Sequence, residues 1–179
     1  TTLKAFVKKG GNIIVIPSQE GNVQNMNSFL SGFGSIQFNA LNSNEKKVTK
    51  INFNHPLFSG VFEKKIDNFQ YPTVKSSFTI SATSPSILTF DDQTSFLTSV
   101  KNDIASVYIF SGAINKNNSN FQNSPLIVPT FYNMAVSSQK MGVKSILIGE
   151  KISYVTDAQL TKDEILEIKN DKEKFIPVQ

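Results

Sequence analysis

The chain has 179 residues, of which 39% are hydrophobic and 18% charged, and its net charge is +4 at pH 7. This composition excludes intrinsic disorder, and no stretch approaches the ~20 continuous apolar residues that a bilayer span needs. The chain has no Arg, so its 18 positive side chains are all Lys, and the side chain best suited to bidentate contacts with phosphate or guanine is missing. It has no Cys, which excludes disulfides, zinc–thiolate sites and cysteine nucleophiles. We therefore expect a soluble folded domain that does not bind nucleic acids.

The first 34 residues predict a helix, a buried strand and a second helix. Leu3, Phe6 and Val7 share a helical face, and Gly10 and Gly11 follow where that helix should end. The unbroken apolar run from Asn12 to Pro17 is typical of a strand covered on both faces in the middle of a parallel sheet. The second helix is predicted from apolar residues at helical spacing, Met26, Phe29, Leu30 and Phe33.

The middle of the chain is rich in predicted strands. Residues 35–41 and 48–53 alternate between polar and apolar side chains, and five further candidates follow at 69–71, 74–81, 86–90, 94–101 and 104–111. Asp91-Asp92-Gln93 is the clearest hairpin turn. The aromatic side chains of these strands are interpreted as core, with a stacking surface for sugars as the alternative.

The last third of the chain predicts a loop, a helix and short strands. Residues 113–124 are rich in Asn and Ser, which indicates an exposed loop of functional or mobile character. A helix is expected to follow Pro125, and strands are expected at 145–149, 151–155 and 175–178. Thr161-Lys162-Asp163-Glu164 is a capping-box pattern that favours a helix, but we assign residues 163–170 to a strand. The chain begins inside an apparent helix, so we interpret it as a piece of a larger protein.

The order of three motifs resembles a known family. These are the segment Leu3–Ser18 with its FVKKGG and buried strand, the turn His55-Pro56-Leu57-Phe58, and the segment Ile127–Ala135. Together they resemble the class I glutamine amidotransferase-like (flavodoxin-like) domain of BatA-type aerotolerance membrane proteins of bacteria, over residues 1–137. The resemblance implies an α/β fold with a partial flavodoxin-like parallel sheet. The sheet is partial because the chain is expected to start partway through the family's domain. We expect this sheet to be followed by an antiparallel β-rich part and a C-terminal β extension. The expected domains are an amidotransferase-like α/β domain at 1–140 and the β extension at 141–179.

Candidate chemistry centres on the loop after the first strand and on the only His. The carboxyl end of a strand in an open α/β sheet is where ligands tend to bind, so Ser18, Gln19, Glu20 and His55 are the candidate ligand-binding residues. A serine hydrolase using Ser18 and His55 is one alternative, although Ser18 lacks the G-x-S-x-G elbow. The simpler interpretation is that Ser18 caps a loop and that His55 forms hydrogen bonds within its turn. No cofactor and no metal site are predicted.

The leading functional interpretation is a non-catalytic structural or protein-interaction domain. The family's glutaminase activity needs a Cys nucleophile, which this chain lacks. The resemblance implies a membrane-anchored bacterial envelope protein, a location on the periplasmic side of the inner membrane, and partners among its other domains or other envelope proteins. A partial sheet should leave an edge exposed, which predicts a homodimer through that edge. A small-molecule or sugar-binding module remains the other alternative.

Overall fold

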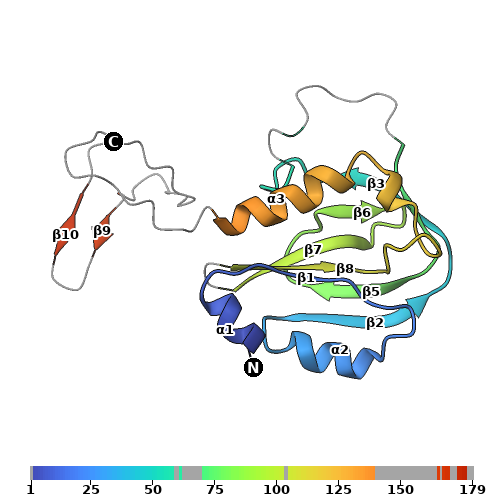
Figure 1. Ribbon diagram of the computed structural model, residues 1–179, viewed down its shortest axis with the longest axis horizontal. Coiled ribbons are helices and arrows are strands. Elements are labelled where there is room, and N and C mark those ends of the chain that lie inside the picture. Colours follow the sequence, from blue (N-terminus) through green and yellow to red (C-terminus); the bar gives the residue numbers. More distant parts are fainter. Residues whose placement is uncertain are drawn as a thin grey trace. The chain divides into compact units, whose positions relative to one another are not determined.

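The computed structural model describes residues 2–58, 61, 70–102, 105–139, 165, 167–169 and 173–176. The chain divides into two compact units, Thr1–Gly142 and Val143–Gln179. The first is a mixed α/β unit built on a six-stranded sheet (Figure 1). In the second, β9 (Ile168–Lys169) and β10 (Lys174–Phe175) form an antiparallel pair. The strands predicted at 145–149 and 151–155 lie outside the described residues.

The sheet of the first unit is mostly antiparallel. Its strands lie in the order β1 (Ile13–Val15), β8 (Ala105–Phe110), β7 (Ser95–Asn102), β6 (Leu88–Phe90), β3 (Lys46–Ile51) and β4 (Thr73–Val74). The pair β1–β8 is parallel and the other pairs are antiparallel. A separate antiparallel pair joins β2 (Ile36–Asn42) to β5 (Ser77–Ala82). The prediction of an α/β fold is confirmed, but a parallel sheet is correct only for β1 and β8.

Local sequence explains where α1 (Thr2–Lys8) ends. Gly10 has φ 90°, a left-handed conformation that glycine adopts without a steric penalty. Its N–H donates to the Val7 carbonyl at 2.9 Å, and the Gly11 N–H donates to the Phe6 carbonyl at 3.0 Å. These two bonds form a Schellman motif, which satisfies the last carbonyls of the helix. The predicted helix end is confirmed, but only Val7 of the expected apolar face is buried, since Leu3 and Phe6 are exposed.

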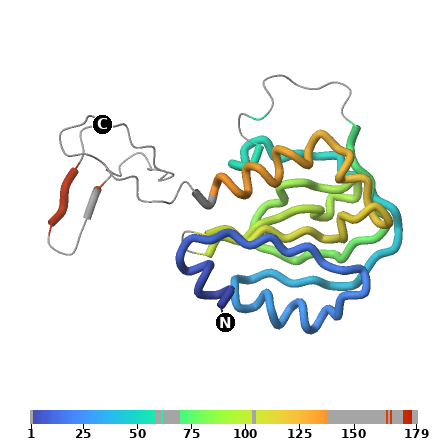
Figure 2. The backbone as a smooth tube through the Cα atoms, in the orientation of Figure 1, coloured from blue at the N-terminus to red at the C-terminus, as the bar shows by residue number. Residues whose placement is uncertain are grey.

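Two further helices flank the sheet. α2 (Val23–Leu30) is capped by Asn22, whose side chain accepts a hydrogen bond from the Asn25 N–H. α3 (Ile127–Gln139) carries Pro129 in its first turn, where no helical N–H is needed. η1 (Phe121–Asn123) is a short 3₁₀ turn before α3. Figure 2 shows that β1, from the start of the chain, lies beside β8, from a much later segment.

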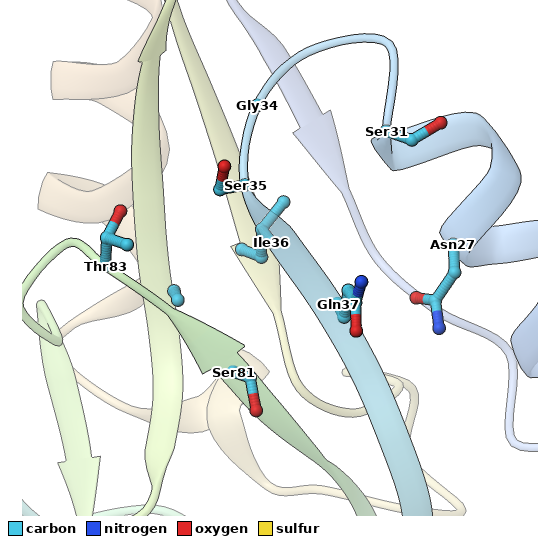
Figure 3. Close-up of a pocket in the computed structure, with 9 residues that line it drawn as sticks. Asn27, Ser31, Gly34, Ser35, Ile36, Gln37, Ser81 and Thr83 are labelled. Carbon is cyan, nitrogen blue, oxygen red and sulfur yellow. The ribbon is translucent and has the colours of Figure 1, made fainter.

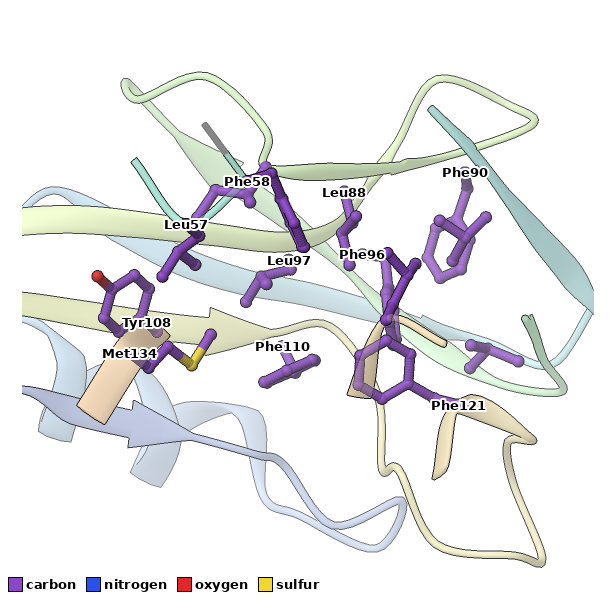
Figure 4. Packing of buried hydrophobic residues seen from close by; sticks show 14 residues of the cluster. Leu57, Phe58, Leu88, Phe90, Phe96, Leu97, Tyr108, Phe110, Phe121 and Met134 are labelled. Carbon is purple, nitrogen blue, oxygen red and sulfur yellow. The ribbon is translucent and has the colours of Figure 1, made fainter. Parts of the chain in front are cut away.

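The sheet has a core on each face because successive side chains of a strand point to opposite sides. On β8, Tyr108 and Phe110 pack into one cluster with α3 and η1, whereas Val107 and Ile109 pack into another with α1, α2, β2 and β5. Phe96 lies at the centre of the first cluster (Figure 4). Its ring is 5.3–5.4 Å, centroid to centroid, from those of Phe90, Phe110 and Phe121. The predicted core role is thus confirmed for the aromatic residues Phe78, Phe90, Phe96, Tyr108 and Phe110.

Three local predictions are wrong. β1 lies at the edge of the sheet instead of its middle, with Ile14 37% and Ile16 41% exposed. Of the strand expected at 69–71, residue 69 lies outside the described residues, and residues 70 and 71 are not in a strand, since β4 begins at Thr73. Residues 113–124 are only partly an exposed loop, since Asn115, Lys116 and Asn117 are exposed but Asn118, Ser119, Phe121 and Ser124 are buried. For β1 and for residues 113–124, long-range pairing, which local patterns do not report, decides the outcome.

Candidate functional site

The loop after β1 is closed by local hydrogen bonds. The Ser18 carbonyl accepts from the Gly21 N–H at 3.0 Å, and Ser18 Oγ accepts from the Glu20 N–H at 3.3 Å. Ser18 and Glu20 are exposed. This is the loop-capping role that the simpler interpretation assigned to Ser18.

Gln19 leaves this loop and enters a polar cluster at the carboxyl ends of β1 and β8. Its Nε2 donates to Ser76 Oγ and to Asn118 Oδ1, both at 2.7 Å. Asn118 is fully buried. Its Oδ1 also accepts from the N–H and the Oγ of Ser76, each at 2.9 Å, while its Nδ2 donates to the carbonyls of Ser76 and Ala113. The cluster therefore joins three segments that are distant in sequence.

The Gln19–Asn118 cluster is saturated. Both amide hydrogens of Gln19 and both of Asn118 already have acceptors within the chain. No charged side chain takes part in these bonds. A ligand at Asn118 would have to replace hydrogen bonds that are already made, which costs free energy. The geometry therefore fits a structural role, in which these hydrogen bonds hold the loop after β1 in place.

His55 lies elsewhere, in the turn after β3. Its Nδ1 accepts the Leu57 N–H at 3.2 Å, and its Nε2 lies 3.5 Å from Ser99 Oγ on β7. The hydrogen bonds of Ser18 and His55 in the described part of the chain do not join the two residues. The structure thus brings Gln19 to Ser76 and Asn118, and His55 to Ser99, but does not assemble the four predicted residues into one site.

The His55 imidazole is oriented as a donor toward Ser99. Because Nδ1 accepts the Leu57 N–H, the proton of the neutral ring must sit on Nε2. An Nε2 that carries a proton cannot remove one from Ser99 Oγ. Burial lowers the pKa of His55 from 6.5, and the positive charge of Lys101 lowers it further. The ring is therefore held neutral in the tautomer that is wrong for activating a serine.

A shallow cleft of about 550 Å³ lies where β2 and β5 meet the end of α2 (Figure 3). Six of its nine lining residues carry a hydroxyl or carboxamide group and none carries a charge, although apolar atoms supply more of its surface: Asn27, Ser31, Gly34, Ser35, Ile36, Gln37, Ser81, Ala82 and Thr83. Hydroxyl and amide groups of this kind can bind a neutral polar ligand. No local pattern in the sequence indicates this cleft, because its residues come from separate segments.

The outer edge of β2 is capped by a side chain. Asn27 Nδ2 donates to the Phe38 carbonyl at 2.8 Å, and its Oδ1 accepts the Phe38 N–H at 2.7 Å. The carboxamide thus pairs with the strand as another strand would. The N–H and C=O of Phe38 are therefore not free to pair with a second chain at this edge.

The Asn-rich loop caps β4 in the same way. The Asn120 N–H donates to the Thr73 carbonyl at 3.3 Å, and Asn120 Oδ1 accepts the Thr73 N–H at 2.8 Å. Val74 forms a bridge with Ser119, and the Lys75 N–H donates to the Asn118 carbonyl. The Asn and Ser residues whose abundance suggested a mobile loop therefore bond to the backbone at the edge of β4.

The outer edge of β1 is different, as the alternation of backbone groups along β8 shows. The Ser106 N–H points toward β1, where it donates to Asn12 Oδ1 at 2.8 Å, and the Ser111 N–H points away, to the Phe96 carbonyl. Since backbone groups alternate along a strand, Tyr108 must face β1. Tyr108 is aligned with Ile14 in a parallel pair, where backbone hydrogen bonds are slanted. The N–H and C=O of Tyr108 therefore bond to Ile13 and Val15, the neighbours of Ile14.

Ile14 therefore directs its N–H and C=O away from the sheet. No hydrogen bond of these groups is found among the described residues. The Ile14 and Ile16 side chains are partly exposed beside this edge, and the stretch Ile13–Ile16 contains no Lys or Pro that would discourage pairing. Of these three strand edges, β1 is the one left unpaired in the part of the chain that the structure describes.

The chain matches no known protein family, no characterised protein and no solved structure. Within the described ranges, no cluster of three His, Cys, Asp or Glu side chains could hold a metal ion. Within the same ranges, no helix has the length and apolar character of a membrane span.

Sequence reasoning missed Ser76, Ser99, Asn118 and the edge of β1. Ser76 and Asn118 belong to polar stretches of a kind that usually faces solvent, and their partners lie far away in sequence. The apolar run at Ile13–Ile16 did give a signal. It could not tell a central strand from an edge strand, because both kinds of strand carry apolar side chains.

Proposed function

We propose that this chain is a non-catalytic protein-interaction domain and that the outer edge of β1 is its binding surface. The observation that carries the proposal is the contrast between the edges. Asn27 bonds both backbone groups of Phe38 on β2, and Asn120 bonds both backbone groups of Thr73 on β4. The outward N–H and C=O of Ile14 have no such bond among the described residues, and they lie beside exposed isoleucine side chains. An extended segment of another chain could add to such an edge as a further strand.

The geometry at His55 and Ser18 supports the non-catalytic part of the proposal. The hydrolase alternative requires a hydrogen bond between Ser18 and His55, and the bonds of these residues go to Glu20, Leu57 and Ser99 instead. Gln19 is tied to the Asn118 cluster. The hydrogen bonds of Ser18, Gln19 and His55 therefore support a structural role for these residues.

The context of the domain is also a proposal. The three motifs within residues 1–137 support a degenerate class I glutamine amidotransferase-like, flavodoxin-like module of a BatA-type membrane protein, on the periplasmic side of the inner membrane. The order α1, β1, α2 and the parallel β1–β8 pair fit such a module, whereas the antiparallel strands β7, β6 and β3 depart from it. A full-length reading frame with flanking membrane spans would support this context, and one without them would contradict it.

Selection from a displayed library of eight-residue peptides tests the binding surface. Peptides rich in β-branched residues should bind the wild-type chain and lose binding to Ile14→Pro. Residue 14 donates no hydrogen bond to β8, so proline removes the outward N–H without breaking the sheet. Peptides that bind Ile14→Pro equally well, or a selection that yields none, would contradict the proposal.

The cleft beside α2 supports a second candidate function, the binding of a small neutral polar ligand such as a sugar. The supporting observation is its lining of hydroxyl and amide side chains around about 550 Å³. A thermal-shift screen with a glycan panel tests it, since a bound ligand raises the melting temperature. A shift that Gln37→Ala removes would support this function, and the absence of any shift would contradict it.

A further inference from the structure

We infer that the partner of the β1 edge is a second copy of this chain, paired antiparallel across a twofold axis. The inference rests on the proposed function, because it uses the same edge. It adds the identity and the orientation of the strand that pairs with Ile14.

The first argument is self-complementarity. A twofold interface needs a surface that fits itself. β1 meets this need because Ile14 presents both a donor and an acceptor outward, so each copy can give and accept a backbone hydrogen bond. Ile14 of one copy would lie opposite Ile14 of the second copy, so these two partly exposed isoleucine side chains would contact each other across the joined edge.

The second argument is charge. Lys8 and Lys9 are exposed just before β1, and Glu20 is exposed just after it. In an antiparallel pair, the end of β1 that follows Lys8 and Lys9 in one copy lies next to the end that precedes Glu20 in the second copy. In a parallel pair, lysines would face lysines, and like charges placed opposite each other are destabilising. The charges therefore favour the antiparallel arrangement.

The third argument concerns strength. β1 has only three residues, so the joined edge supplies few hydrogen bonds and buries a small area. Interfaces of this size belong to weak and transient complexes. The expected dimer is therefore one that forms at high protein concentration and dissociates on dilution.

Sedimentation equilibrium from ~10 µM to ~1 mM, the range suited to a weak interface, tests the inference. The wild-type chain should shift from monomer toward dimer, and Ile14→Pro should weaken association by ~10-fold or more. Ile14→Lys places a charge at the edge and serves as a second variant if Ile14→Pro does not fold. Lys47→Glu, an exposed change on β3, is the matched control and should leave association unchanged.

A charge exchange tests the orientation. Lys8→Glu with Lys9→Glu should weaken the dimer severalfold, Glu20→Lys should weaken it as well, and the triple variant should restore it. A triple variant that remains as weak as its parents would overturn the antiparallel arrangement. A wild-type chain that stays monomeric at all concentrations, or a dimer that Ile14→Pro leaves intact, would overturn self-pairing. Peptide binding that depends on Ile14 would then still support the proposed function, so the two failures are distinguishable.

Discussion

Gln19 Nε2 donates a hydrogen bond to Asn118 Oδ1 across 2.7 Å, although 99 positions separate the two residues in the chain. The bond ties the loop after β1 to the loop that caps β4. The same Asn118 side chain holds Ser76, which precedes β5. One carboxamide thus fixes the edge strand β1 with respect to the opposite end of the sheet.

Asn118→Ala should destabilise the fold by about 3 kcal/mol, because it leaves several buried donors and acceptors without partners. Urea unfolding measures this change. Asn117→Ala is the matched control, since Asn117 is exposed and should change stability by less than about 0.5 kcal/mol. Equal effects of the two substitutions would show that the Gln19–Asn118 cluster does not stabilise the fold.

Asn27→Ala should open the outer edge of β2. The loss of two hydrogen bonds to Phe38 should cost about 1–2 kcal/mol, and the freed edge should promote self-association. Chemical unfolding and light scattering measure the two effects. Asn25→Ala on the exposed face of α2 should show neither, and a soluble Asn27→Ala protein of wild-type stability would refute the capping role.

Asp92→Asn should weaken the β6–β7 hairpin. Asp92 accepts from the buried Lys46 ammonium at 2.7 Å, and Lys46 also lies over the Phe90 ring. The loss should be about 1–2 kcal/mol, less than for a fully buried pair, because Asp92 is partly exposed. Asp91→Asn, in the same turn, should have a smaller effect, since among the described residues Asp91 Oδ1 accepts a hydrogen bond from the Asp92 N–H and Asp91 forms no ion pair.

The Asp92 pair also predicts an acid-dependent loss of stability. Burial raises the pKa of Asp92, but hydrogen bonds from Lys46 and Thr94 outweigh it and lower the pKa from 3.8 to about 2. The unfolded chain therefore binds this proton first as the pH falls, so the contribution is complete above pH 3.8 and is lost toward pH 2. Asp92→Asn should flatten this part of the stability profile, and an unchanged profile would refute the assignment.

His55 predicts a second pH dependence. Its pKa in the folded state lies below 6.5, first because of burial and then because of Lys101. The unfolded chain takes up the proton more readily, so stability should be complete above pH 6.5 and should fall as the pH drops below it. Melting temperatures between pH 8 and pH 5 measure this effect. His55→Asn should remove the dependence, and since His55 is the only His, an equal slope in the variant would contradict it.

The features that sequence predicted well depend on neighbouring residues. The end of α1 follows from Gly10, which supplies the left-handed turn. The hairpin at Asp91–Gln93 follows from its polar residues, and the Phe90 N–H there bonds to the Thr94 carbonyl across the turn. Such short-range chemistry is visible in the sequence itself.

The features that sequence missed depend on distant partners. An Asn such as Asn118 is usually exposed, and it is buried here because Gln19, Ser76 and Ala113 together satisfy its side chain. An apolar run such as Ile13–Ile16 is usually covered on both sides, and its position at an edge follows only from the order of the strands. Neither fact can be read from a local pattern.

Amide hydrogen exchange at single-residue resolution tests the role of β1 most directly. In a dilute solution the Ile14 amide should exchange rapidly, whereas the Val15 amide, which is bonded to β8, should be protected. Raising the protein concentration should slow exchange at Ile14 and leave Val15 unchanged. An Ile14 amide as protected as that of Val15 at the lowest concentration would contradict an open edge, and with it the proposed binding surface.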